Sequence, residues 1–260
     1  MKLRSYYIFA FFFTSLVLSA QETIQPKQMD TNFGIVYNQE FAMGIRLHTN
    51  GFAVGTTFGK LKTYYLTKYF HFEVGELKHE KEFRQSFDTP TPIGGHISRA
   101  FKYGKQNNLY VVRGAIGAKR YFSEKAKHKG VAFGISYEGG ATIGLLKPYY
   151  LELRAGDGRN SVSTRYSDEN ADRFLDIYSI QGASGWMKGF SKLSVLPGAN
   201  AKFAVHFDWG AYDEYLKSVE AGIMVDFFSK QAPIMVERDN VENNQLFLNL
   251  FLHLQFGKRW

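Results

Sequence analysis

LFLNLFLHLQF, residues 246–256, places an apolar side chain at every even position. Leucine holds the even positions from 246 to 254 and Phe256 ends the series, whereas Asn249, His253 and Gln255 stand at odd positions. Successive side chains of a β-strand point to opposite faces. The stretch therefore predicts a strand with one aliphatic face and one face that carries amide and imidazole groups.

The same period of two residues recurs along the chain, whereas the helical period of 3.6 is nearly absent. Nine segments alternate clearly, beginning near residues 33, 52, 69, 110, 131, 149, 200, 218 and 246. A tenth, at 174–182, alternates poorly. Asn50-Gly51 between the first two segments is a strong hairpin signal. We therefore expect an all-β chain of about 10 antiparallel strands, with 8 or 12 as alternatives.

Composition narrows the classes of protein that the chain can represent. It has 260 residues, no cysteine and a formal net charge of +8 that is not concentrated in any Lys/Arg cluster. Disulfides and thiolate metal sites are thus excluded, and a nucleic-acid partner is not expected. No Pro- or Ser-rich linker divides the chain, so one domain is the economical interpretation.

The first twenty residues have the layout of a secretory signal. Lys2 and Arg4 precede an apolar run at 6–18, and Ala20 stands just before a polar stretch. Residues 6–18 are too few for a membrane-spanning helix, which needs about 20 apolar residues. We expect a signal peptide at 1–20 removed after Ala20, a flexible lead-in at 21–31 and the barrel domain at 32–260.

The face opposite the apolar one distinguishes a membrane barrel from a soluble lipocalin-like barrel. It is rich in small residues, which suit the crowded interior of a narrow closed barrel: Gly34, Ala42, Gly44, Ala53, Gly55, Gly117, Ala132, Gly134, Gly140, Ala204 and Gly222. It also mixes acidic residues (Glu40, Glu73, Glu138, Glu152, Asp208, Glu220, Asp226) with basic ones (Arg46, Arg113, Lys119, Arg154, Lys202). Opposite charges of this kind can pair inside a barrel whose apolar face meets lipid.

The final strand carries a resemblance to a known class. The sequence resembles bacterial outer-membrane β-barrel proteins, whose last strand ends at or near an aromatic residue, and Phe256 and Trp260 match that pattern. The resemblance implies a closed transmembrane barrel in the cell outer membrane. It also implies contact with outer-membrane lipid and lipopolysaccharide, and recognition of Phe256 or Trp260 by the barrel-assembly machinery.

Several groups of residues invite a catalytic or ligand-binding interpretation, and none supports an enzyme. His96 and Ser98 are similar to the pair in outer-membrane lipid A deacylases, but no glutamate follows at a convincing distance. Residues 168–172 lack the spacing of a calcium loop. His206 and Asp208 share one face and fit an internal salt network. We therefore expect no catalytic residue, no metal and no cofactor.

The sequence leaves several functions open. The first is a non-enzymatic outer-membrane barrel, acting as a narrow pore or as an anchor that presents loops to protein partners. A lipid-modifying barrel enzyme and a soluble secreted carrier are the alternatives. If the C-terminus is periplasmic, Asn50-Gly51, residues 80–108 and residues 228–244 are external. With ten strands, residues 156–173 are instead expected on the periplasmic side.

Overall fold

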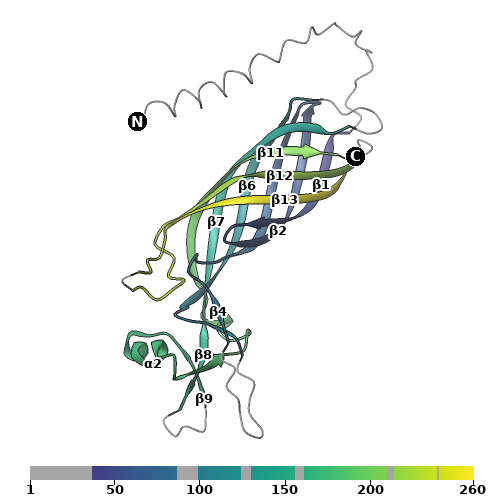
Figure 1. Ribbon diagram of the computed structural model, residues 1–260. Coiled ribbons are helices and arrows are strands. Elements are labelled where there is room, and N and C mark those ends of the chain that lie inside the picture. The colour runs from purple at the N-terminus through teal and green to yellow at the C-terminus, as the bar shows by residue number, and fades with distance from the viewer. Residues whose placement is uncertain (1–36, 87–98, 124–129, 156–160, 210–213, 239) are drawn as a thin grey trace, which may run out of the picture. The chain divides into compact units, whose positions relative to one another are not determined.

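Eight of the alternating segments are strands of one closed antiparallel barrel (Figure 1). The computed structural model describes residues 37–86, 99–123, 130–155, 161–209, 214–238 and 240–260. The barrel strands are β1 (Gln39–His48), β2 (Gly51–Thr63), β3 (Leu66–Leu77), β6 (Asn107–Tyr121), β7 (Ala132–Pro148), β11 (Ser194–Asp208), β12 (Tyr215–Phe228) and β13 (Leu246–Arg259). Each pairs with the next in chain order, and β1 pairs with β13 to close the ring.

The connections divide the barrel into two unlike ends. The chain joins strands at 64–65, 122–131 and 209–214 at the end that carries the C-terminus, which we call the terminal end. At the opposite, loop end it joins them at 49–50, 78–106, 149–193 and 229–245. The predicted tight hairpin is present, one residue earlier than expected, because His48 pairs with Gly51 across Thr49 and Asn50.

The opening stretch is β13, and its leucines face outward. Leu250 is 63% exposed, whereas Asn249, His253 and Gln255 are buried in the lumen. The neighbouring strands repeat this division, so exposed apolar side chains cover the outer wall: Met43, Ile45, Phe58, Phe70, Phe72, Val74, Ile116, Ile143, Phe203, Ile223 and Leu248. The aliphatic face is therefore the outside of the barrel.

Small residues face the lumen, as the sequence predicts for those within the described ranges. An atom built at the Cβ position of Gly44 would lie 2.4 Å from His253 Nε2. A Cβ on Gly59 would lie 2.4 Å from Glu40 Cγ. Glycine suits these positions because long lumen side chains from the neighbouring strand occupy the space.

The expected count of ten strands is wrong, and eight is correct. Residues 150–154 form β8 (Tyr150–Arg154), which pairs with β9 (Ser161–Arg165) and β10 (Ile180–Ala183) in a separate sheet. Glu152 and Arg154 consequently lie outside the lumen. The doubtful segment at 174–182 is the end of a short helix, α2 (Ala171–Leu175), followed by the start of β10. Residues 156–173 thus belong to a loop-end connection and not to the end where ten strands had placed them.

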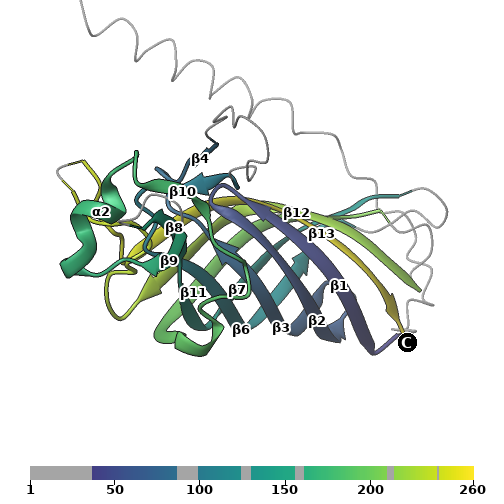
Figure 2. The same ribbon diagram turned by 90° about the horizontal axis from the view of Figure 1, so that it is seen from below.

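Three loop-end connections fold together into a small head, defined here as the described residues of 78–106, 149–193 and 229–245 (Figure 2). Besides the sheet β8–β10 it contains β4 (Arg84–Gln85), β5 (Phe101–Lys102), and the short helices η1 (Asp168–Asn170) and η2 (Phe190–Lys192). Its own apolar core joins all three connections: Phe101, Leu151, Leu153, Phe174, Ile180 and Val236. No helix among the described residues is long and apolar enough to cross a membrane.

A valine at Gly44 tests how tightly the lumen is packed. We expect Gly44→Val to lower the free energy of unfolding by about 1–3 kcal/mol, because the new side chain collides with His253. Gly139→Val is the matched control, since Gly139 faces outward and an added Cβ would meet nothing closer than 3.8 Å. Urea titration in detergent micelles measures both. Equal stability of the two variants would contradict a packed lumen.

Candidate functional site

The lumen, through which a pore would have to pass, contains buried ion pairs. Near the loop end, Arg113 binds Asp226 through two nitrogens, at 2.7 and 2.9 Å, and binds Glu73 at 2.6 Å. Arg46 also reaches Glu73, at 2.9 Å, and lies 3.5 Å from Glu138. All five side chains are buried. Two arginines therefore hold three carboxylates in one connected group.

The middle of the lumen continues this network. Lys202 lies 3.0 Å from both Glu138 and Glu220, so it links the two carboxylates. His206 and His253 contact the oxygens of Glu220 at 3.0 and 3.5 Å. Because Glu138 also contacts Arg46, the ion pairs run without interruption from the loop-end group into the middle of the barrel.

The terminal half of the lumen closes the network. The Tyr121 hydroxyl lies 3.1 Å from His206 Nε2 and accepts a hydrogen bond from Arg259 at 3.4 Å. Tyr121 therefore connects the terminal half of the lumen to the ion pairs in its middle. Arg259 binds Asp208 at 2.9 Å and Glu40 at 3.3 Å. Lys119 binds Glu40 at 3.1 Å and donates to Gln255 at 3.2 Å. Buried charges are tolerated when they are paired in this way.

An apolar layer lies above the ion pairs at the loop end. Ala232, Ile234 and Met235 come from the 229–245 connection and pack among inward-facing strand residues: Leu77, Leu109, Val111, Leu146, Leu196, Phe228 and Phe247. Asn243 ties this segment down by accepting from the backbone nitrogens of Ile234 and Met235 at 3.0 and 3.1 Å. The described side chains thus fill the lumen from its ion pairs to its loop-end mouth.

The residues weighed from sequence for chemistry do not form a catalytic or metal site within the described ranges. His206 pairs with Glu220 and Asp208 with Arg259, so both belong to the lumen network as predicted. Residues 168–172 form η1 and the start of α2, and the described part of the chain has no His, Asp and Glu group arranged to hold a metal ion. His96 and Ser98 lie outside the described residues.

The expected assembly residues lie at the terminal end. Phe256 is exposed on the outer face of β13. Trp260 is also exposed, and its backbone pairs with Gln39 beside β1. Both side chains are accessible in the folded barrel, and their recognition during assembly stays a prediction.

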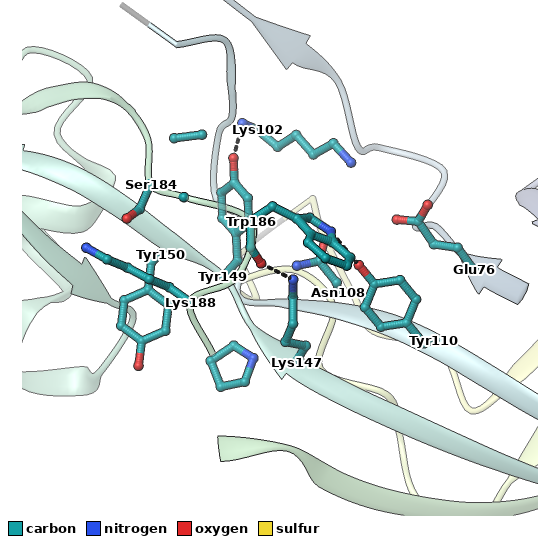
Figure 3. Close-up of a pocket in the computed structure, with 13 residues that line it drawn as sticks. Glu76, Lys102, Asn108, Tyr110, Lys147, Tyr149, Tyr150, Ser184, Trp186 and Lys188 are labelled. Atoms are coloured by element: carbon teal, nitrogen blue, oxygen red, sulfur yellow. Dashed lines mark hydrogen bonds between the residues drawn. The ribbon is translucent and has the colours of Figure 1, made fainter. Parts of the chain in front are cut away.

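A pocket on the outer wall at the loop end is the strongest candidate for binding (Figure 3). We call it the wall pocket; its volume is about 320 Å³. Outward-facing residues of β3, β6 and β7 form its floor, and the 183–188 segment forms its roof. The complete lining is Glu76, Lys102, Asn108, Tyr110, Lys147, Pro148, Tyr149, Tyr150, Ala183, Ser184, Gly185, Trp186 and Lys188. Three lysines, three tyrosines and a tryptophan therefore meet in one place.

Lys147 lies inside an aromatic cage within the wall pocket. Its Nζ is 4.4 Å from the ring centroid of Phe190, 4.6 Å from that of Trp186 and 5.7 Å from that of Tyr110. It donates one hydrogen bond to the Trp186 carbonyl oxygen, at 2.8 Å. Trp186 Nε1 in turn donates to the Tyr110 hydroxyl at 3.3 Å (Figure 3). These contacts hold the roof of the pocket against the barrel wall.

The other two lysines differ in how far their charge is already neutralised. Lys102 pairs with Glu82, which Lys105 also contacts at 2.7 Å. Burial acts to raise the pKa of the Glu82 carboxyl, but Lys105 and Lys102 outweigh it and hold that pKa below its ordinary value. Lys188 lies 3.7 Å from Glu152 and is half exposed. Lys147 and Lys188 are therefore the pocket cations that are best placed to meet an anion.

The wall pocket was not predicted from the sequence. Its residues come from Glu76, from Lys102, from the start of β6, and from two separate stretches of the chain, 147–150 and 183–188. The lone outward-facing charge of Lys147 after the apolar Ile143 and Leu145 was the available signal. Alternation alone could not show that Trp186 and Phe190 fold back over it.

Removing one lumen arginine tests whether the ion pairs hold the barrel together. We expect Arg113→Gln to lower the free energy of unfolding by about 3–5 kcal/mol, because Asp226 and Glu73 lose a buried counter-charge. Arg120→Gln, in the same strand but on the exposed outer face, should change it by less than ~0.5 kcal/mol. Unfolding in urea, followed by tryptophan fluorescence, measures both. A small effect at Arg113 would refute a structural role for the network.

Comparison with known proteins finds similar solved structures but no matching family. No protein-family model matches the chain, and no curated protein sequence does. The solved structure of Ail, the attachment invasion locus protein of Yersinia pestis, aligns with a TM-score of 0.40 and 5% identity over 86% of this chain and 99% of that one. The N-terminal β-barrel domain of Pseudomonas aeruginosa OprF aligns at 0.36, with 8% identity over 86% and 98%. Neisserial surface protein A aligns at 0.34, with 9% identity over 86% and 94%. The chain resembles bacterial outer-membrane β-barrel proteins.

Proposed function

We propose that this protein is a non-enzymatic outer-membrane anchor, a sealed barrel that holds its folded head on the outside of the cell. The observation that carries the proposal is the contrast between the two parts of the chain. The lumen is filled by paired charges and closed by an apolar layer, whereas the head has its own core and exposed side chains. This arrangement suits attachment and display.

The outer wall supports insertion into a membrane. The apolar face of β13 runs from Leu246 to Phe256, eleven residues. At about 3.3 Å per residue and a tilt of roughly 40°, this face covers about 25 Å of height, which is the thickness of the apolar band on outer-membrane barrels. Closure of β1 on β13 also leaves no strand edge unpaired in lipid.

Charged rows lie above and below the apolar band. Toward the terminal end, Lys60 pairs with Lys68 on the outer face, next to the apolar pair of Phe58 and Phe70. Toward the loop end, Glu76 is the first charged residue of the same row on β3. These rows mark levels at which headgroups and water would replace hydrocarbon.

The lumen supports an anchor over a narrow pore. Eight strands leave an interior just wide enough for side chains, and here those side chains pair with one another along the barrel. An open path for ions would require breaking several buried pairs. The pore function left open by the sequence is therefore the less favoured interpretation.

The head supports display toward partners. Tyr178 is 87% exposed and Met187 is 72% exposed, although the head has an apolar core of its own. Exposed large apolar side chains on a folded platform are typical of protein or lipid contact sites. We propose that the head is the contact surface, and that no nucleic acid is involved.

The route to the membrane completes the proposal. Residues 1–20 act as an export signal that is removed after Ala20, residues 21–31 form a lead-in, and Phe256 or Trp260 is read by the barrel-assembly machinery. The exposed positions of Phe256 and Trp260 are consistent with that role.

Cysteine labelling on intact cells tests the location and orientation of the barrel. The native chain has no cysteine to interfere. We expect an impermeant maleimide to modify Gln85→Cys, Glu169→Cys and Ser229→Cys, because all three lie at exposed loop-end positions. Glu214→Cys at the terminal end is the control and should react only after the outer membrane is permeabilised. Labelling of Glu214→Cys alone on intact cells would reverse the orientation, and recovery of the chain in the soluble periplasm would refute membrane insertion.

Conductance across a planar bilayer tests whether the barrel is sealed. We expect no steady current steps from the purified chain, because the described lumen side chains are paired and packed. A wide porin inserted under the same conditions serves as the positive control. Reproducible, ion-selective channels from this protein would overturn the sealed barrel and restore the pore hypothesis.

A further inference from the structure

We propose that the wall pocket binds the phosphorylated sugar headgroup of a glycolipid in the outer leaflet of the membrane. This inference rests on the proposed function, because it requires the loop end to be outside. It assigns a ligand class and a site to residues that the anchoring role does not use.

The height of the pocket on the wall is the first argument. Glu76, Tyr110 and Leu145 pair with one another on the outer face, directly above the apolar row of Val74, Val112 and Ile143. Asn108 and Lys147 form the next pair toward the loop end. The pocket floor is therefore the same wall that faces hydrocarbon, continued past its last fully apolar row. In the proposed orientation this level is occupied by headgroups of the outer leaflet.

The charge of Lys147 is the second argument. Its side chain is only 2% exposed, yet among the described residues no carboxylate lies within 4.0 Å of its Nζ, and Glu76 in the same pocket attracts it only from farther away. An ammonium has three donors; the Trp186 carbonyl oxygen accepts from one, and aromatic rings, which are no match for a full negative charge, surround the rest of the group. Lys188, half exposed at the pocket rim, supplies a second cation. Two ammonium groups of this kind suit a phosphate.

The rest of the lining suits a sugar. Tyr110, Tyr149 and Tyr150 supply flat, amphipathic rings that can pack against a sugar face, and Glu76 and Asn108 supply acceptors and donors for hydroxyl or amide groups. The volume of about 320 Å³ is at the small end of the range for small-molecule sites, about 300–1,000 Å³. A headgroup of one or two sugar rings is therefore favoured over a long polysaccharide.

The roof indicates that the ligand has acyl chains. Trp186 is 65% exposed, and its neighbour Met187 is also mostly exposed, beside Lys188. Apolar side chains next to lysines at the edge of a bilayer bind amphiphiles, because the apolar groups meet hydrocarbon and the ammonium groups meet phosphate. A soluble sugar would leave Trp186 and Met187 without a partner.

Native mass spectrometry of the full chain in detergent tests the inference. The probe is diphosphoryl lipid A, titrated against the native protein, Lys188→Gln and Lys147→Gln. We expect each variant to bind about tenfold more weakly, the effect of losing one charge-assisted hydrogen bond. Lys68→Gln, an outward-facing lysine at the opposite end of the wall, is the matched control and should bind within twofold of the native protein. Lys188→Gln guards against misfolding, since the Lys188 side chain is half exposed and its ion pair with Glu152, at 3.7 Å, lies at the surface of the head.

Three comparisons decide what is recognised. Lipid A without its phosphates, and phosphatidylglycerol without a sugar, should each bind at least tenfold more weakly than diphosphoryl lipid A. A soluble phosphorylated disaccharide that binds as tightly as lipid A would overturn the membrane source of the ligand. Equal binding by the native protein, Lys188→Gln and Lys68→Gln would overturn the site itself. If cysteine labelling places the loop end outside and these binding differences are absent, the inference fails while the proposed function stands.

Discussion

The pairing of buried charges inside the barrel is the interaction on which the rest of the structure depends. Among the described residues, six carboxylates (Glu40, Glu73, Glu138, Asp208, Glu220, Asp226) face five fixed cations (Arg46, Arg113, Lys119, Lys202, Arg259) in the lumen. Each of these groups would cost several kcal/mol if it were buried alone. Because the outer wall is apolar, the side chains have no alternative polar surface to turn toward. The strands must therefore close into a ring that brings both signs together.

The same constraint explains the glycines and the apolar layer. Long charged side chains need space inside a narrow lumen, and glycines on neighbouring strands provide it, as Gly59 does for Glu40. Where the charges end, below the loop-end mouth, Ile234 and its neighbours replace them with an apolar layer. Such a layer separates the ion pairs from bulk water. Because the attraction between opposite charges is stronger in a less polar environment, more free energy is needed to separate them.

Most of the barrel wall could be predicted from the sequence, and its strand count could not. Alternation assigned the correct face to the charges that it placed on true barrel strands, because period two reports which side of a sheet a residue faces. It cannot report which sheet the strand joins. Tyr150–Arg154 alternates as clearly as a wall strand, yet it pairs with β9 and β10 in the head. Arg259 was not predicted as a lumen residue, although it lies in phase with the inward-facing residues of β13.

The wall pocket shows why a binding site of this kind escapes analysis by pattern. Its floor continues the outer wall of the barrel, where outward-facing residues are apolar up to the headgroup level. Lys147 is the first charged residue after the apolar outward positions of β7. Its roof belongs to the head, whose fold depends on contacts between connections that are far apart in the sequence. One such contact is the hydrogen bond that Val236 N donates to the Gly104 carbonyl oxygen at 2.8 Å. Only the folded chain places Trp186 over Lys147. Among the described residues, no carboxylate lies within ion-pair distance of Lys147, whereas the lumen charges are paired, and an anion from outside the chain would supply the missing partner.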